Sequence, residues 1–407
     1  MALVGTAAAA PKPDTRPKKI DPKPLPRVPL TAENKAGEFI AQGRVIWRIA
    51  ACGSDEAPPS RFDNKTITRH CKEMAELYAR HKKRWADQAK QFLGELRPKD
   101  APKTVVYPFG GGDLSSALVA FPDATEITTI SLEAAGDARQ IDNIRIGTLA
   151  GDLGEVSSYI RHLYGSAYSA TMNLQKASRD ATFPGTLMMI FAGLALHDME
   201  PVSMRYFDVL PDGTIDYLSG TELEARAAEY AATKRDKLRP KKITHYWYAH
   251  DSAFGNIEIQ YRPRGEPKAA TRVYRHIVQN LDDEHLRADP RVIHHLKKKG
   301  KVSVMTKAAS FLLWYDDFTD IRNYLLGAIA WMVSDASGIP PAHAGPAGLE
   351  QITYGEFTGP LFVIDSKNVR KQFIKLWKDQ PKRPLTFRFG YPDVNKRPHL
   401  MVTRPKP

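Results

Sequence analysis

The feature that most constrains the fold of this chain is a run of three glycines that follows a short apolar segment. The glycines are Gly110, Gly111 and Gly112, and the segment before them, residues 104–107, contains two valines and a tyrosine. A β-branched and aromatic run of this length, bounded by Pro108, is typical of a buried parallel strand. Glycine accepts positive φ angles and lets a ligand come close to the backbone, so the pattern predicts a strand followed by a sharp turn.

The residues after the glycines predict a helix and then a second strand. Asp113 is a good N-cap for a helix over residues 114–120, whose free N–H groups would point over the end of the first strand. A second apolar run, residues 127–132, ends at Glu133, which lies 21 residues after Gly112. An acid at about this spacing binds a ribose in dinucleotide folds. The pattern G-x-G-x-x-G is absent, however, and Asp113 brings negative charge to a place where a pyrophosphate needs positive potential.

This arrangement resembles the first motif of class I S-adenosylmethionine-dependent methyltransferases, whose cofactor carries no phosphate. The resemblance implies a Rossmann-like, mostly parallel α/β sheet and S-adenosylmethionine as the cofactor. The contacts it implies are ribose hydroxyls on Glu133 and a cofactor beside the turn of Gly110, Gly111, Gly112 and Asp113. The chain departs from the family at residues 107–109, Tyr-Pro-Phe, where the family carries an acid just before the glycines. The alternative is a turn that joins two strands and binds nothing.

Several segments also resemble a broad set of uncharacterised bacterial proteins. They are YPFGGGD with SLEAAG, KAASFLLWYDDFTDIRNYLL, SDASGIP and ITYGEFTGP, and together they span most of the chain after the first thirty residues. In those proteins a similar turn precedes a strand that ends in Glu. This resemblance implies no activity. It indicates that residues 107–113, Glu133 and residues 307–340 belong to one structural arrangement.

Composition places the chain among ordinary soluble proteins. It is 42% hydrophobic and 26% charged, and it has no run near the ~18 apolar residues that a membrane span needs. The net charge of +13 favours acidic partners such as nucleic acid or an anionic membrane surface. The basic residues are dispersed along the chain, which argues against nucleic-acid binding without excluding it. The sequence therefore identifies no partner.

Three parts are expected along the chain. Residues 1–30 alternate proline with charge, which predicts an extended, disordered tail or tether. Residues 31–100 predict a helical hairpin packed on the main domain, and residues 101–407 predict the α/β domain, with antiparallel β-hairpins inserted at about residues 200–265. The opening MALVGTAAAAPKP ends like a signal-peptide cleavage site but lacks a basic n-region, so an export signal stays open.

The chain has two cysteines, Cys52 and Cys71. Helical patterning over residues 33–51 ends at Cys52, and a long helix predicted for residues 64–96 carries Cys71 in its first part. A hairpin of these helices would bring the thiols close enough to form a disulfide, which persists in oxidising compartments. Two buried free thiols are the alternative. A bridge favours an exported or cell-envelope protein, and free thiols favour a cytoplasmic one.

The rest of the chain alternates helices and strands. Helices are expected at residues 154–164, 167–176, 185–196, 221–234, 285–299 and 367–379. A hairpin is expected within residues 202–218, and further strands at 243–250, 256–263, 271–280, 301–306, 350–357, 385–391 and 399–403. The segment from residue 307 predicts one core helix with Phe318, Tyr324 and Met332 on its apolar face, followed by a polar loop from Ser334.

A few residues outside the glycine turn are candidates for chemistry. Asp335 lies in that polar loop and is either a general base or the cap of the next turn. Tyr354 precedes a glycine in a predicted strand, and either it or Asp335 would lie near the acceptor in a methyltransferase. His197, beside an aspartate, ends a helix, where a histidine suits the helix dipole better than catalysis. His245 and His250 have no spacing that makes them converge on a metal.

The sequence leaves two functions of different classes open. The first is a methyltransferase of unknown acceptor that binds S-adenosylmethionine at the glycine turn. Such an enzyme needs little acid or base help, because positioning of the methyl group and the nucleophile supplies much of the rate. The second is a non-catalytic, exported cell-envelope protein that is tethered by its tail, binds no cofactor and uses the glycine turn only as a structural element.

Overall fold

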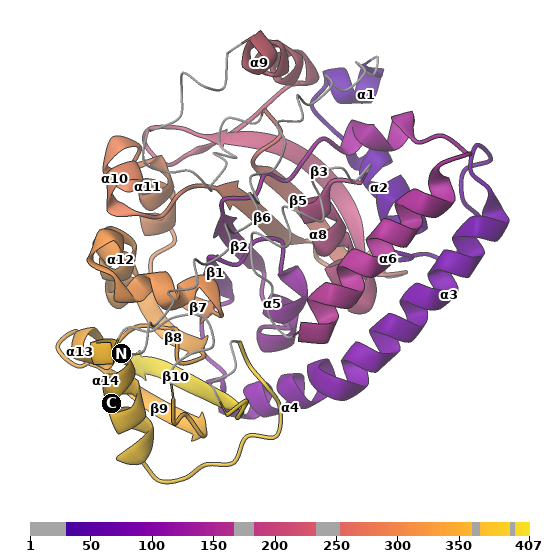
Figure 1. Cartoon of the computed structure of the whole chain (residues 1–407). Coiled ribbons are helices and arrows are strands. Elements are labelled where there is room, and N and C mark those ends of the chain that lie inside the picture. Colours follow the sequence, from indigo (N-terminus) through magenta and orange to yellow (C-terminus); the bar gives the residue numbers. More distant parts are fainter. Residues whose placement is uncertain (1–29, 167–182, 233–252, 360–366, 391–394) are drawn as a thin grey trace, which may run out of the picture.

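The computed structural model describes residues 30–166, 183–232, 253–359, 367–390 and 395–407. Within them the protein is a mixed α/β fold built on one ten-stranded sheet, with helices on both faces (Figure 1). No helix in this described part is long and apolar enough to cross a membrane. The expected tail, the helix at 167–176 and the strand at 243–250, with both of its histidines, lie outside the described residues, apart from residue 30.

The sheet has a parallel centre and antiparallel flanks. Its strands are β1 (Thr104–Pro108), β2 (Glu126–Ser131), β3 (Met199–Val209), β4 (Ile215–Tyr217), β5 (Ile257–Pro263), β6 (Arg272–Val278), β7 (Val302–Thr306), β8 (Ile329–Ser334), β9 (Leu349–Gly355) and β10 (His399–Pro405). They are arranged in the order β4-β3-β5-β6-β2-β1-β7-β8-β10-β9. Strands β6, β2, β1, β7 and β8 are parallel to their neighbours in this group, and every other pairing is antiparallel. Within the parallel group, β2 and β6 therefore lie on one side of β1, and β7 and β8 lie on the other.

Helices precede the first strand and also lie in several of the connections between strands. Those before residue 200 are α1 (Ala32–Lys35), α2 (Ile40–Ile49), α3 (Asn64–His81), the π-helix η1 (Lys82–Ala86), α4 (Asp87–Leu96), α5 (Leu114–Ala120), the 3-10 helix η2 (Ala138–Asn143), α6 (Leu149–Ser166) and α8 (Gly185–Leu196). Those after it are α9 (Gly220–Ala232), α10 (Asp283–Ala288), α11 (Arg291–Lys297), the 3-10 helices η5 (Ala309–Trp314) and η6 (Asp316–Phe318), α12 (Thr319–Ala328), α13 (Pro341–Ala344) and α14 (Lys367–Lys378).

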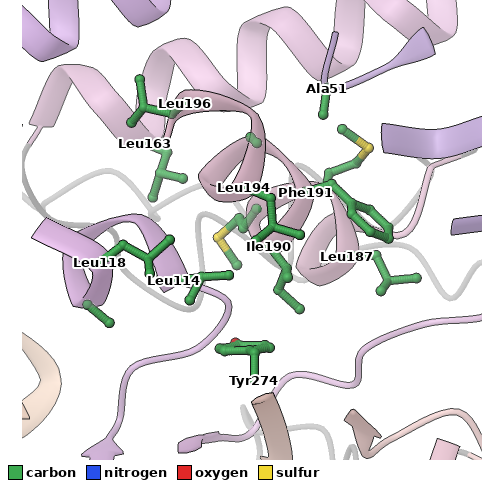
Figure 2. Close-up of a cluster of buried hydrophobic side chains, with 14 of the residues drawn as sticks. Ala51, Leu114, Leu118, Leu163, Leu187, Ile190, Phe191, Leu194, Leu196 and Tyr274 are labelled. Atoms are coloured by element: carbon green, nitrogen blue, oxygen red, sulfur yellow. The ribbon is translucent and has the colours of Figure 1, made fainter. Parts of the chain in front are cut away.

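Two hydrophobic clusters lie on the two faces of the sheet. The larger one contains α8, which is apolar on all sides and packs against α5 and against Tyr274 of β6 (Figure 2). Its members Leu187, Ile190, Phe191 and Leu194 are all fully buried. The same cluster includes side chains of α2, α3 and α4, so the helices of residues 31–100 share a core with the sheet. The second cluster joins α10, α11 and α12 to the opposite face.

The local predictions around the glycine turn are confirmed. Helix α5 covers residues 114–120 as expected, and the Asp113 side chain accepts a hydrogen bond from the backbone N–H of Ser116, which makes it the N-cap. Strands β1 and β2 pair in parallel beside each other. Helix α8 likewise covers residues 185–196. Each of these elements is specified by residues close to it in the chain.

Two predicted elements are wrong. The core helix expected to extend through Met332 ends at Ala328, and Ile329–Ser334 form strand β8 instead. A short apolar run of this kind has no periodicity that separates a buried strand from a buried helix, and pairing with β7 and β10 decides the outcome. The strand expected at residues 385–391 is also wrong, since the described residues 385–390 form no strand. Their alternating apolar side chains pack into the larger cluster from an irregular segment.

Cys52 and Cys71 form a disulfide, with their Cα atoms 5.3 Å apart. Of the two alternatives that the sequence leaves open, a bridge at the α2–α3 hairpin and two buried free thiols, the structure has the bridge. Two further contacts fasten α3 to the end of α2. His70 Nε2 lies 2.8 Å from the carbonyl oxygen of Ala50. The Tyr78 hydroxyl donates to the carbonyl oxygen of Ala51, at 2.8 Å.

The disulfide leads to a first prediction. Replacing both cysteines by serine should lower the free energy of unfolding by about 3 kcal/mol, because the bridge closes a loop with a sequence separation of 19. Urea unfolding with and without reductant measures the difference, and reductant should leave the double variant unchanged. Alkylation of two free thiols in the unreduced, native protein would contradict the bridge.

Candidate functional site

The carboxyl ends of the five parallel strands meet at one edge of the sheet. In open α/β sheets, ligands bind outside this edge at the point where the strand order reverses. Here that point lies between β1 and β7. The polar residues that follow the strands are Asp113 after β1, Glu133 after β2, Gln279 after β6, Lys307 after β7 and Asp335 after β8. The topology thus gathers Asp113, Glu133 and Asp335 of the predicted site at one edge.

The three glycines of the turn differ in what they face. A Cβ atom on Gly110 would lie 2.6 Å from the Tyr107 ring, and one on Gly112 would lie 2.9 Å from the carbonyl oxygen of Thr186. These two glycines allow close packing against the protein itself. Gly111 has a φ of +54°, and the one atom within 4 Å of its Cβ position is Glu133 Oε2, at 3.9 Å. Within the described residues, Gly111 is therefore the glycine that faces the predicted ribose acid.

Glu133 is a buried acid with an unsatisfied oxygen. Its exposed fraction is 9%, and Oε2 has no hydrogen-bond partner among the residues that the structure describes. Its own backbone N–H bonds to the Ser131 hydroxyl at 3.2 Å, which fixes the turn after β2. A buried carboxylate oxygen without a donor is costly. The side chain is thus arranged to accept hydrogen bonds from a group that these residues do not supply.

A chain of buried polar groups links this acid to the glycine turn. His276 Nε2 donates to the backbone carbonyl of Glu133 at 2.6 Å, so its Nδ1 is the acceptor that faces Thr129 Oγ1 at 3.1 Å. The Tyr274 hydroxyl lies 2.7 Å from Thr129 Oγ1 and 3.3 Å from the carbonyl oxygen of Gly111. Burial lowers the pKa of His276 and keeps the ring neutral. Side chains of β2 and β6 therefore hold both turns in one geometry.

Asp113 is paired with a lysine that the sequence analysis did not single out. Lys307 Nζ lies 2.7 Å from Asp113 Oδ2 and donates to the Ser116 hydroxyl at 2.8 Å. The Tyr107 hydroxyl, whose pKa is raised by burial and then by the charge of Asp113, donates to the same carboxylate oxygen at 3.2 Å. The lysine and aspartate side chains are only 8% and 13% exposed. The ion pair neutralises the negative charge that made Asp113 a surprising residue at this turn.

The π-helix η1, which joins α3 to α4, contacts this edge of the sheet through Trp85. Lys307 Nζ lies 5.7 Å from the centroid of the Trp85 ring, within the range of a cation–π contact. The indole N–H of Trp85 donates to the carbonyl oxygen of Arg388 at 2.7 Å, and the His81 ring stacks on the Trp85 ring at 5.3 Å. π-turns inside α-helices are rare and occur often at functional sites. This one turns Trp85 toward the lysine.

Asp335 joins the loops that follow β7 and β8. Its Oδ2 accepts from the backbone N–H of Ala308 at 3.2 Å, and Oδ1 accepts from the backbone N–H of Ser337 at 2.9 Å and from the same residue's hydroxyl. The side chain is fully buried. Ala308 adopts a φ of +62°, which a non-glycine residue rarely does. These contacts match the expectation of a turn cap, and a general-base role for Asp335 stays a prediction.

Two other candidates lie apart from this edge. Tyr354 is on β9, four strand positions from β1 and so about 19 Å away. Its ring packs edge-on against Phe92 at 5.4 Å. His197 Nε2 lies 3.1 Å from the carbonyl oxygen of Ser115, and this contact joins α8 to α5. Among the described residues, no three histidine, cysteine or carboxylate side chains converge as metal ligands.

No protein-family model, curated protein or solved structure matches this chain. The geometry of the carboxyl edge is therefore the basis for any functional proposal. Sequence reasoning named Gly111, Glu133 and Asp113 but missed Lys307, Trp85 and His276. His276 could have been found from the sequence, because a histidine on a buried parallel strand needs a hydrogen-bond partner.

The glycine geometry can be tested by alanine substitution. Gly110→Ala should lower the free energy of unfolding by about 3 kcal/mol, because the new methyl group overlaps the stiff, buried Tyr107 ring. Gly111→Ala should cost about 1 kcal/mol, from positive φ alone. Gly94→Ala, in an exposed part of α4 with no atom within 4 Å, is the control and should stabilise by about 1 kcal/mol. Equal urea midpoints for all three variants would refute this geometry.

Buried histidines predict a loss of stability in mild acid. Burial is the main cause that lowers the pKa values of His81, His197 and His295 to about 4. Between that value and the ordinary value near 6.5, the unfolded chain binds protons that the folded protein does not, so stability falls as pH falls. Each histidine should contribute a slope of up to ~1.4 kcal/mol per pH unit. Urea unfolding between pH 7.5 and 4.5 measures the slope, which His81→Phe should reduce. A flat profile would contradict the burial of these rings.

Proposed function

We propose that this protein has a Rossmann-like, methyltransferase-like fold and binds a nucleoside-containing ligand at the carboxyl edge of its sheet. The ligand is most simply S-adenosylmethionine, and the activity is then transfer of its methyl group to an acceptor that the structure does not identify. The observation that carries the proposal is the unpaired, buried Oε2 atom of Glu133, which faces Gly111 at the end of the second strand. A ribose supplies two adjacent hydroxyl donors for such a carboxylate.

The strand order supports this proposal. If the inserted strands β3, β4 and β5 are left aside, the other seven, numbered along the chain, lie in the order 3-2-1-4-5-7-6. The first five follow a doubly wound order. The resemblance to class I methyltransferases implies a sheet that ends in an antiparallel pair. Here the last strand, β10, lies antiparallel between β8 and β9.

Methyl transfer suits the polar groups at this edge. Positioning of the methyl donor and the acceptor supplies much of the rate, so a strong general base is not required. Asp335 is fully buried and bonded to Ala308 and Ser337, which suits a residue that shapes the acceptor side. Tyr354 lies too far along the sheet to take part directly, since four strand positions separate β9 from β1.

The disulfide favours a second candidate function, a non-catalytic protein of the cell envelope. Structural disulfides persist in oxidising compartments, whereas S-adenosylmethionine is a cytosolic cofactor. In this alternative the glycine turn is only structural, and Glu133 meets a donor other than a nucleoside. The two candidates differ in one measurable property, the binding of S-adenosyl compounds.

Calorimetric titration separates the two candidates. S-Adenosylmethionine and S-adenosylhomocysteine should both bind the folded protein if the proposal holds. Absence of heat at high micromolar ligand, with a sample shown to be folded by its unfolding transition, would remove the methyltransferase proposal and leave the envelope protein. Intact-mass analysis of unreduced protein from the native host would establish the N-terminus and the disulfide in the same sample.

Glu133→Gln tests the ribose contact itself. The substitution should weaken S-adenosylhomocysteine binding by about 1–3 kcal/mol, because it removes a charged acceptor. It should also leave the ligand-free protein as stable or more stable, since the amide does not bury an unpaired charge. Glu266→Gln, in an exposed turn, is the matched control and should change neither quantity. Unchanged affinity together with lower stability would assign Glu133 a purely structural role.

A further inference from the structure

We propose that one face of helix α14 binds the surface of an anionic lipid bilayer. This lysine face consists of four exposed residues of the helix, Lys367, Lys371, Lys375 and Lys378. The contact is electrostatic and peripheral, and it requires no ligand at the carboxyl edge of the sheet. The inference therefore goes beyond the proposed function and does not depend on it.

The excess of positive charge is concentrated near the ends of the chain, although basic residues occur throughout it. Residues 349–407, the C-terminal unit, contain twelve basic and five acidic residues, a net charge of +7. Residues 1–31 contain six basic and two acidic residues, whereas residues 32–348 contain 41 and 39 and are nearly neutral. More than half of the net charge of +13 therefore lies in the C-terminal unit, where it attracts partners of the opposite sign.

The acidic residues of the C-terminal unit leave most of its positive charge in excess. Its described residues, 349–359, 367–390 and 395–407, include twelve basic side chains and three acidic ones. Each of these acids pairs with a basic residue of the same unit, in the pairs Glu350–Arg404, Glu356–Arg397 and Asp379–Lys375. The described part of the unit therefore carries nine more positive charges than negative ones.

Helical spacing places the four lysines on one side of α14. Intervals of four and three residues bring side chains above one another, so the lysine face extends along about 16 Å of helix. Phe373 and Trp377 lie on the other side and are buried in a third hydrophobic cluster with Trp314 and Phe357. Figure 1 shows α14 at the outside of the molecule, next to β9. The aromatic side thus holds the helix on the fold and leaves the lysine face to the solvent.

The stability of the helix does not explain the lysine face. Like charges four residues apart on a helix repel each other. Lys367 begins α14, where a positive charge also opposes the helix dipole, and the first turn contains no acidic residue. An anionic surface relieves this repulsion, because it brings negative charge to all four side chains at once.

Three observations favour a bilayer over nucleic acid. The exposed basic residues of α14 are all lysines, whose point charges attract lipid phosphates without the fork geometry that arginine uses in nucleic-acid recognition. Every aromatic side chain in the described part of the C-terminal unit is buried or partly buried, so bases have no exposed ring to stack on. The Cys52–Cys71 disulfide favours an oxidising compartment such as the cell envelope, which is bounded by membranes.

Vesicle binding by the unmodified, unreduced protein is the first test. The protein should sediment with vesicles made of equal parts of phosphatidylglycerol and phosphatidylcholine, and it should stay in the supernatant with phosphatidylcholine alone. Binding should be lost at 1 M salt, where the screening length is about 3 Å. Absence of binding to the anionic vesicles at low salt, equal binding to both kinds of vesicle, or binding that resists salt would overturn the inference.

Substitution then assigns the binding to α14. The triple variant Lys367→Gln, Lys371→Gln and Lys378→Gln keeps Lys375 and its pair with Asp379. Its partitioning onto the anionic vesicles should fall about a hundredfold, because each lysine near such a surface contributes about a factor of five. The substituted side chains are exposed, so the urea midpoint should not change.

The matched control removes the same number of charges elsewhere. The variant Lys72→Gln, Lys83→Gln and Lys90→Gln alters three exposed lysines of α3, η1 and α4, and it should reduce partitioning less than threefold. Equal losses in the two variants, or no loss in the first, would overturn the inference. If the first variant does not fold, the vesicle series on the unmodified protein decides alone.

Competition with duplex DNA distinguishes the two kinds of polyanion. DNA of mixed sequence, added at a phosphate concentration equal to that of the accessible anionic lipid, should leave the protein on the vesicles. Release of the protein by this amount of DNA would assign the lysine face to nucleic acid and overturn the bilayer as its partner.

Discussion

The carboxyl edge of this sheet is governed by the need of buried polar groups for hydrogen-bond partners. Asp335 meets that need through the loops it joins, and Asp113 through its helix cap and Lys307. Thr129 and His276 meet it through each other and through the turns beside them. Each satisfied group fixes a loop in place. Three buried oxygens at this edge have no partner among the described residues, Glu133 Oε2, Thr306 Oγ1 and Ser334 Oγ, and the first is the carboxylate oxygen among them.

The same constraint acts at both flanks of the ten-stranded sheet, on β9 and on the part of β3 that does not pair with β4. On β3, the Glu38 carboxylate accepts from the backbone N–H of Met204, and the backbone N–H of Phe39 donates to its carbonyl. On β9, the Gln380 side chain bonds to the backbone of Gln351 and Thr353 as a neighbouring strand would. Exposed strand edges invite pairing with other chains. The inserted strands β3, β4 and β5 extend the sheet, whereas its parallel centre carries the candidate site.

How far the sequence could predict this structure depends on the range of the deciding interactions. The unit from β1 to Glu133 was predictable, because the interactions that decide it are local. Asp113 caps the helix that follows it, and Gly111 adopts the positive φ angle of the turn. Strand β8 was not, since its apolar residues suit a helix equally well until β7 and β10 flank it. The pairing of Lys307 with Asp113 could not be predicted for a similar reason. Its partner lies nearly half the chain away, and only the parallel pairing of β1 with β7 brings them together.

The disulfide and the candidate site are connected through one helix, but they bear on different properties of the protein. Cys71 lies in α3, and the π-turn at the end of that helix places Trp85 over Lys307. Tyr78 and the Ala51 carbonyl hold α3 to α2 through a contact that needs no bridge, and the stack of His81 on Trp85 lies beyond it. Contacts other than the bridge therefore also hold the π-helix η1 in place. It follows that the bridge bears on the compartment in which the protein works, whereas the unpaired acid bears on what it binds.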